Sequence, residues 1–249
     1  MLLKSQLFII FSNLIFASTV QIAVSANVSY AVEELKRSFN RLYPDIEVKT
    51  VIGSSGKLTA QIERGAPFDI LLSADMSYPD RLYRNGFAIT KPLIYARGTL
   101  ALFSREGREE LSRGVEILAD SSIKRVAIAN PKTAPYGLAS VNALKRVGIY
   151  GGVSNKFIFG ENISSTFNYA LKATDVGIVA KSLLLSPKLK GRFKEGVNWV
   201  ELNSSIYEPI KQGTVILKEG AGDRDVALLF SFLFSREAQE IFKRFGYLN

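Results

Sequence analysis

The chain contains neither cysteine nor histidine among its 249 residues. Without cysteine it cannot form disulfides, thiolate metal sites or a thiol nucleophile, nor carry a lipid on an N-terminal cysteine. Without histidine it cannot hold a serine–histidine hydrolase centre or an imidazole-liganded metal. These two absences exclude enzymes and metal sites that depend on a thiolate or an imidazole.

The chain also lacks a long run of charge of one sign. It carries 32 Lys and Arg against 23 Asp and Glu, a net charge of +9, with the two signs interleaved along the sequence. A nucleic-acid-binding arm would need its basic residues gathered together, so we expect no nucleic-acid partner. A dispersed positive charge still attracts small anions in general. The length allows one large domain or two small ones, with a real core.

The first residues have the pattern of an export signal. A short positive start precedes an apolar run over 7–16, which is too short and too interrupted to span a membrane. We expect residues 1–18 to be a signal peptide, cleaved after Ala17 or Ser18, and the mature protein to be periplasmic. Cleavage after Ala26 also fits the small-residue rule but would delete an expected strand. An uncleaved apolar N-terminus is the remaining alternative.

Apolar runs typical of strands alternate with helical patterns along the chain. The expected strands cover 19–25, 46–52, 68–73, 125–129, 156–159 and 176–179. Such alternation predicts parallel α/β sheets, which bind ligands at the carboxyl ends of their strands. Two long extended runs, 93–103 and 207–217, are candidates for strands that cross between two domains. A helical stretch over 224–245 closes the chain, with Gly246 as its stop signal.

Two expected helices carry apolar residues at spacings of three and four, which predicts that these residues face the core. In the first helix they are Val28, Val32, Leu35, Phe39 and Leu42. In the second helix they are Leu138, Val141, Leu144 and Val147.

Residues 53–58 (GSSGKL) form a small Gly/Ser loop between a strand and a helix. The start of a helix presents unpaired backbone N–H groups and the positive end of the helix dipole, and hydroxyls add further donors. The loop is therefore suited to bind an anion. It is not a nucleotide P-loop, because the spacing is wrong and Leu58 stands where the magnesium-binding hydroxyl would be. The alternative is that Ser54 or Ser55 only caps the helix.

Seven segments together resemble one known family, the periplasmic molybdate-binding proteins of ABC importers. They occur in order from about residue 20 to the end of the chain: 25–31 (SANVSYA), 53–58 (GSSGKL), 62–69 (IERGAPFD), 72–75 (LSAD), 130–137 (NPKTAPYG), 175–179 (DVGIV) and 238–247 (AQEIFKRFGY). Each segment alone is a weak signal, and their common order makes the resemblance specific.

The resemblance implies an α/β, two-lobed type II periplasmic-binding fold. Each lobe would be a mixed, mainly parallel sheet flanked by helices, and two crossover strands would join the lobes. We expect lobe I over 19–98 plus 210–249 and lobe II over 99–209. The protein would be a monomer that binds molybdate, and tungstate as well, in the cleft between the lobes. It would deliver this oxyanion to an inner-membrane ABC permease, without a cofactor and without a site for a bare metal ion.

The resemblance also implies which residues meet the ligand. In the family the oxyanion is held by hydroxyl and backbone N–H donors near helix N-termini, and no charged group is needed. Matched position by position, the ligand contacts fall on Asn27 with Ala26 beside it, Ser55 with Ser54 beside it, Tyr136 and Ile163. Tyr136 and Ile163 would contribute their backbone N–H groups.

The chain departs from the family at two positions. Many members have serine or threonine where Asn27 stands, though some have asparagine. Many members have a tyrosine just after the strand over 176–179, where this chain has Ala180. The hydroxyl of Tyr136 or an extra amide in the first loop would compensate. On the residues alone, Asn27 could instead cap a helix and Tyr136 could be a packing residue. The alternative function is binding of another oxyanion, such as sulfate or a phosphonate, by a protein of the same fold.

Overall fold

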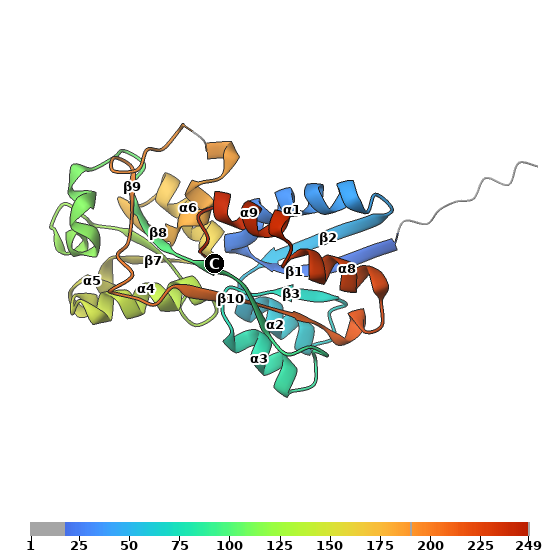
Figure 1. Cartoon of the computed structure of the whole chain (residues 1–249). Helices are drawn as coiled ribbons and strands as arrows, with labels where there is room; N and C mark the ends of the chain where they lie inside the picture. Colours follow the sequence, from blue (N-terminus) through green and yellow to red (C-terminus); the bar gives the residue numbers. More distant parts are fainter. Residues whose placement is uncertain (1–17, 190, 249) are drawn as a thin grey trace, which may run out of the picture.

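The computed structural model describes residues 18–189 and 191–248 of the chain. Residues 1–17, which make up most of the expected signal peptide, therefore lie outside the described residues. Within the described part, no helix has the length and apolar character that crossing a membrane requires. The described chain folds into two five-stranded sheets, each with helices packed against it (Figure 1).

The first sheet has the strand order β2-β1-β3-β10-β4. β1 pairs in parallel with β2 and β3, whereas β10 runs antiparallel to β3 and β4. The strands of this sheet are β1 (Ser18–Ser25), β2 (Ile46–Gly53), β3 (Ile70–Leu72), β4 (Leu93–Gly98) and β10 (Ile210–Ile216).

The second sheet repeats this arrangement with the order β7-β6-β8-β5-β9. β6 pairs in parallel with β7 and β8, and β5 is the antiparallel strand between β8 and β9. In both sheets four of the five strands run in one direction, so the prediction of two mixed, mainly parallel sheets is confirmed. The strands of this sheet are β5 (Leu100–Phe103), β6 (Val126–Ala129), β7 (Phe157–Gly160), β8 (Val176–Ala180) and β9 (Trp199–Glu201).

Helices cover both faces of the first sheet (Figure 1). Alternate residues of β1 point to opposite faces, as in any strand. Val20 and Ile22 therefore pack into one apolar cluster and Ala23 into the other. One face carries α1 (Ser29–Leu42), α8 (Arg224–Phe232) and α9 (Arg236–Arg244), and the other carries α2 (Ser55–Glu63) and α3 (Ser77–Arg84).

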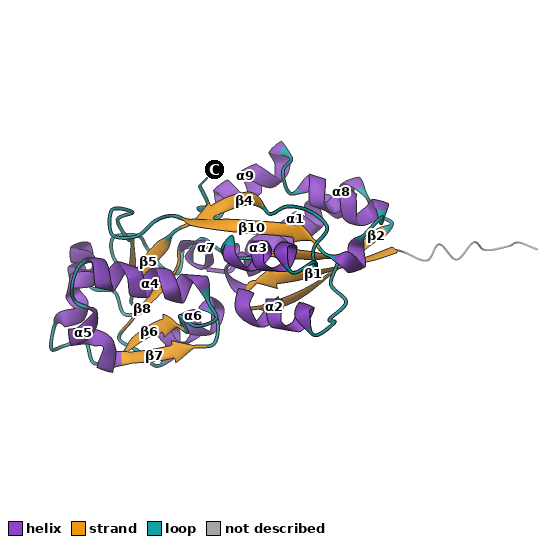
Figure 2. Ribbon diagram, turned by 90° about the horizontal axis from the view of Figure 1, so that it is seen from below, coloured by secondary structure: helices purple, strands orange, loops and turns teal. Residues whose placement is uncertain are grey.

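The second sheet has its own helices and one continuous core (Figure 2). Phe103 of β5 packs edge-on against Phe167 of α6, with ring centroids 5.3 Å apart, an arrangement that aromatic pairs favour. The helices around this sheet are α4 (Pro135–Arg146), α5 (Tyr150–Val153), α6 (Ile163–Lys172) and α7 (Lys181–Leu184).

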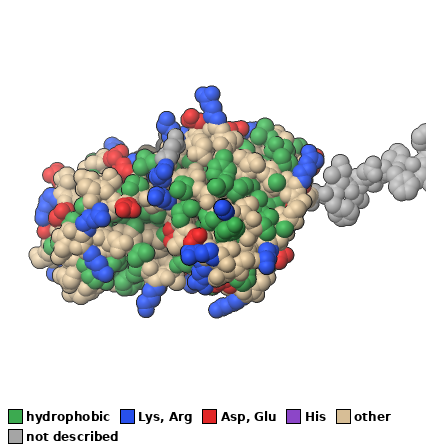
Figure 3. Space-filling view, turned by 60° about the horizontal axis from the view of Figure 1, so that its bottom comes forward, with side chains coloured by type: hydrophobic (Ala, Val, Ile, Leu, Met, Phe, Trp, Pro, Cys, Tyr) green, Lys and Arg blue, Asp and Glu red, His purple; other side chains and the backbone are tan. Residues whose placement is uncertain are grey.

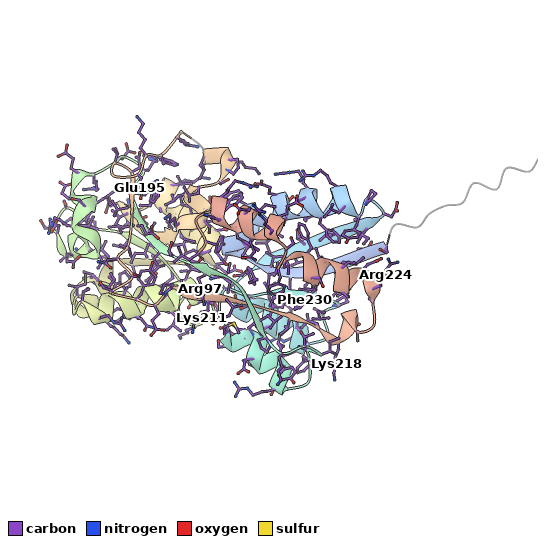
Figure 4. All side chains as sticks on the ribbon, viewed as in Figure 1. Arg97, Glu195, Lys211, Lys218, Arg224 and Phe230 are labelled. Atoms are coloured by element: carbon purple, nitrogen blue, oxygen red, sulfur yellow. The ribbon has the colours of Figure 1, made fainter. Side chains whose placement is uncertain are left out.

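The described chain passes between the two sheets twice. Thr99 alone separates β4 from β5, and residues 202–209 lead from β9 to β10. β4 and β10 pair with each other, and Arg97 lies opposite Lys211 in this ladder (Figure 4). The backbones of Arg97 and Leu248 exchange two hydrogen bonds of 2.8 Å. The C-terminal segment is thereby fixed to the first crossover strand.

Two expected elements are split in the structure. The extended run over 93–103 is two strands, one in each sheet, rather than a single crossing strand. The helical stretch over 224–245 breaks between α8 and α9, where the Ser235 hydroxyl accepts a hydrogen bond from the Ala238 N–H and starts a new helix. A serine N-cap of this kind favours a new helix start over continuation.

In each of the two helices, the prediction that a residue faces the core is wrong at one position. Leu42 is 56% exposed because it ends α1, and Leu138 is 49% exposed. The buried face of α4 passes instead through small residues, Gly137 and Ser140. A Cβ atom on Gly137 would lie 2.2 Å from the carbonyl oxygen of Ala129, so this face is close to the β6 backbone. Apolar periodicity cannot reveal a face that is built on small residues.

Candidate functional site

The first sheet and its helices form lobe I, and the second sheet and its helices form lobe II. The two lobes touch where their parallel strands end. Two contacts join the loops on either side. The Gly56 N–H donates to the carbonyl oxygen of Thr133 at 3.0 Å, and the Lys57 ammonium lies 2.8 Å from the Glu161 carboxylate. The ion pair is half exposed and adds little stability. These contacts show that the lobes are closed on each other at this point.

The loop after β1 is a single 3-10 turn, η1 (Ala26–Val28), and all of it is buried. Lobe II holds its carbonyl groups. The Ser164 hydroxyl donates to the Ala26 carbonyl at 3.0 Å, and the Ser182 hydroxyl donates to the Asn27 carbonyl at 2.8 Å. Because these serines come from α6 and α7, η1 lies between the two lobes.

Ser55 begins α2 and is 0% exposed. Its oxygen accepts a hydrogen bond from the Ala74 N–H at 2.9 Å, which leaves its own proton free to donate. That proton can be donated to the Ser25 hydroxyl, 3.2 Å away, or to a ligand in its place. Ser54 occupies the N-cap position of α2 but makes no capping bond. Its buried hydroxyl has no partner within the described residues, so neither serine caps the helix through its side chain.

Three helices begin at this interface with unpaired backbone donors. Among the described residues, no acceptor is found for the N–H groups of Ser55, Tyr136 and Ile163, which lie in the first turns of α2, α4 and α6. At α6 a capping box between Asn162 and Ser165 binds the N–H groups of those two residues but not that of Ile163. Because helix N-termini carry partial positive charge, the three ends together favour an anion.

The side chain of Asn27 is bonded inside the protein. Its amide nitrogen lies 2.8 Å from Gln212 Oε1, 2.9 Å from the Tyr247 hydroxyl and 3.4 Å from the Tyr136 hydroxyl. The two amide hydrogens are thus taken up by protein oxygens, while Asn27 Oδ1 is buried without a partner. Neither η1 nor α1 has a side-chain cap, so the interpretation of Asn27 as a helix cap is wrong.

Tyr136 is a packing residue, and its hydroxyl is bonded inside the protein. Its ring is buried, only 1% exposed, and its hydroxyl lies in the Asn27 network. Ala180, the place of the missing tyrosine donor, is the buried N-cap residue of α7. The hydroxyl nearest to that place in the sequence belongs to Ser182, and it is bonded to the Asn27 carbonyl.

The buried polar side chains around η1 are neutral amides and hydroxyls. Burial raises the pKa of the Tyr136 and Tyr247 hydroxyls well above the ordinary value, so both remain protonated. Burial also raises the pKa of Asp75, whose carboxylate accepts from Ser77 and the Tyr78 N–H at the start of α3. In the described ranges, no cluster of three or more His, Cys, Asp or Glu could hold a metal ion. Lys and Arg are dispersed on the face seen in Figure 3.

Several polar residues at this interface escaped the sequence analysis. Gln212 is a fully buried amide in β10, and a polar residue inside an otherwise apolar crossover strand is a signal that could have found it. Thr133 was overlooked although it lies in the 130–137 segment, and its hydroxyl is buried without a partner in the described chain. Ser164 and Ser182 carry no local sequence signal, because their contacts with η1 span more than a hundred residues. Tyr247 was overlooked although it ends the 238–247 segment, and its contact with η1 spans 220 residues.

Comparisons with known proteins agree with this architecture. A family model described as bacterial extracellular solute-binding protein matches residues 20–248. The molybdate-binding protein ModA of Rhodobacter capsulatus is 34% identical over 235 residues, covering 94% of this chain and 89% of the relative. The protein of the same name from Azotobacter vinelandii is 32% identical over 233 residues, covering 93% of this chain and 90% of the relative.

A solved structure matches the whole fold. The periplasmic molybdate-binding protein of Azotobacter vinelandii superposes with a TM-score of 0.85 at 28% identity, covering 92% of this chain and 99% of that one. These matches confirm the family resemblance and the two-lobed fold that the sequence predicts. The chain therefore belongs to the bacterial extracellular solute-binding protein family.

Proposed function

We propose that this protein is the periplasmic binding component of an ABC importer and that it captures molybdate, and tungstate as well, between its lobes. The observation that carries this proposal is the presence of unpaired N–H groups from α2, α4 and α6 at a closed interface whose buried polar side chains are neutral. The relatives named above are molybdate-binding proteins, which supports this choice of ligand.

The proposed ligand donors are backbone N–H groups and hydroxyls. Ser55, Tyr136 and Ile163 offer N–H groups, and Ser55 and Ser54 offer hydroxyls. Asn27 and its neighbour Ala26 contribute through the backbone of η1, because the amide hydrogens of Asn27 are already bonded.

The strength of such a site follows from hydrogen bonds to a charged group. Each contributes roughly 1.5–3 kcal/mol. About five of them exceed the roughly 8 kcal/mol of a micromolar complex, which leaves a margin for desolvation and for the cost of closing the lobes. Because the donors sit on helices that are already formed, little entropy is lost in aligning them.

Selectivity follows from size and protonation. Sulfate has shorter bonds than molybdate, so it would not reach donors from both lobes at once. Phosphate is partly protonated near neutral pH, and an N–H group cannot accept a hydrogen bond from that proton. Tungstate matches molybdate in charge and nearly in size, so the same donors would hold it.

The rest of the proposal concerns export and delivery. β1 begins at Ser18 and lies between β2 and β3, so cleavage after Ala26 would remove a central strand. This supports the earlier cleavage, after Ala17 or Ser18, over cleavage after Ala26. We assign lobe I to 19–98 plus 210–249 and lobe II to 99–209, with the closed monomer recognised by an inner-membrane permease.

The identity of the ligand is tested by isothermal titration of residues 19–249 with molybdate, tungstate, sulfate, phosphate and a phosphonate. We expect one-to-one binding of molybdate and tungstate below micromolar Kd, with sulfate weaker by roughly a hundredfold, or about 2.7 kcal/mol. Sulfate or a phosphonate binding more tightly than molybdate would replace the proposed ligand by that anion. An absence of heat and of thermal stabilisation with every oxyanion would contradict the function.

Ser55→Ala tests the hydroxyl donor at the start of α2. The variant keeps the Ser55 backbone N–H but loses the side-chain donor, so molybdate Kd should rise roughly tenfold, by about 1.4 kcal/mol. Ser122→Ala is the matched control, because Ser122 is exposed and precedes β6, at the opposite end of that strand from the loop that meets lobe I. Equal affinity of Ser55→Ala and Ser122→Ala, in variants with native thermal stability, would remove Ser55 from the site.

The neutral site also predicts a flat pH profile. With no histidine or cysteine in the chain and with the pKa of buried Tyr136 and Tyr247 raised, none of the proposed ligand donors titrates between about pH 6.5 and 9. Molybdate Kd should change less than about twofold over that range. Above about pH 10 the unfolded chain loses tyrosine protons that the folded protein retains, so the free energy of unfolding should fall as pH rises. A tenfold change in Kd near neutrality would point to a titrating ligand group.

A further inference from the structure

The backbone N–H and the side-chain hydroxyl of Tyr136 lie in two different parts of the molecule. Its backbone N–H is one of the unpaired donors at the start of α4, on lobe II. Its hydroxyl lies instead at the junction between the lobes, where it is within 3.4 Å of the Asn27 amide nitrogen on lobe I. One residue thus connects a proposed ligand contact with the point about which the lobes would close.

The hydroxyl of Tyr136 rests directly on Gly98. A Cβ atom on Gly98 would lie 1.9 Å from the Tyr136 hydroxyl oxygen and 3.0 Å from the ring carbon that carries it. Gly98 ends β4, one residue before the chain enters β5 of lobe II. Its φ angle is not in the left-handed region, so the backbone does not require glycine here. The requirement is for space, and Tyr136 fills that space.

The second crossover strand supports the same contact. Gln212 of β10 donates from Nε2 to the carbonyl of Ile210 at 2.7 Å, which fixes the orientation of its amide. Its Oε1 atom then faces the Asn27 amide nitrogen at 2.8 Å. The Cβ position on Gly98 is also 3.0 Å from Gln212 Nε2. Tyr136 is therefore held between the two crossover strands and η1.

We propose that Tyr136 is a positioning residue whose hydroxyl, seated on Gly98, sets the angle at which the two lobes stop closing. At that angle the N–H groups of α4 on lobe II and of α2 on lobe I can bind the same anion. A methyl group on Gly98 would halt closure early, because two lobes that turn about the crossover strands cannot pass a clash beside those strands. The Gly56–Thr133 hydrogen bond between the lobes would then form incompletely. This inference rests on the proposed function for its ligand but not for its geometry.

The extent of closure is measured as the distance between two spin labels, one on each lobe. Because the chain has no cysteine, Arg64→Cys on lobe I and Lys132→Cys on lobe II, both at exposed positions, are labelled cleanly. In this background the distance between the labels is recorded by pulsed electron resonance, with and without molybdate. Gly98→Ala is compared with Gly152→Ala, whose added methyl would meet nothing within 4 Å.

We expect Gly98→Ala to lengthen the shortest distance that the labels reach and to raise molybdate Kd roughly tenfold or more, with the melting temperature of the ligand-free protein unchanged. Gly152→Ala should match the parent in every measurement. Tyr136→Phe keeps the backbone N–H and removes the hydroxyl oxygen that the methyl would strike. Adding it to Gly98→Ala should therefore restore part of the short distance and of the affinity, a coupling that independent sites do not show.

The outcomes distinguish a failure of the proposed stop on closure from a failure of the proposed function. If the parent protein binds molybdate and Gly98→Ala reaches the same label distance with the same Kd, the stop on closure is overturned while the function stands. If the parent binds no oxyanion, the proposed function fails, and the label distances without ligand still decide whether Gly98→Ala closes less far. A Gly98→Ala defect that Tyr136→Phe leaves unrelieved would also overturn the role of the hydroxyl.

Discussion

The interface between the lobes depends on one constraint: the first N–H groups of a helix have no acceptor within the helix. In each sheet, helices start where parallel strands end, and the two sheets turn these ends toward each other. The donors of α2 therefore come from one lobe and those of α4 and α6 from the other. An anion satisfies both groups only when the lobes are closed, which links binding to shape.

Neutral groups surround these donors, and hydrogen bonds among them fix the geometry. The Asn27 amide nitrogen meets Gln212 and Tyr247, and the Asn27 carbonyl meets Ser182 and Tyr247. A buried amide of this kind is stable only if its partners stay in place, because an unpaired buried polar group costs about 1–3 kcal/mol. The network thus ties η1 to the second crossover strand, the C-terminal segment and lobe II.

The sequence predicted the elements whose signals are local. Strand alternation, the Gly/Ser loop and the order of seven short segments sufficed for the two-sheet fold and for the family. The missed features depend on contacts that no local pattern encodes: Leu138 is exposed because Gly137 and Ser140 face the sheet. Likewise, the residue type of Asn27 indicates a donor, but only the fold shows that Gln212 and Tyr247, 185 and 220 positions away, engage its side chain.

The central claim is that an oxyanion is held by neutral donors from both lobes, and diffraction from crystals grown with tungstate tests it most directly. The anomalous signal of tungsten marks the anion without reference to any model of the site. The account predicts a single peak within hydrogen-bonding reach of the N–H groups of Ser55, Tyr136 and Ile163. A peak bound instead by lysine or arginine side chains, or lying on one lobe alone, would contradict it.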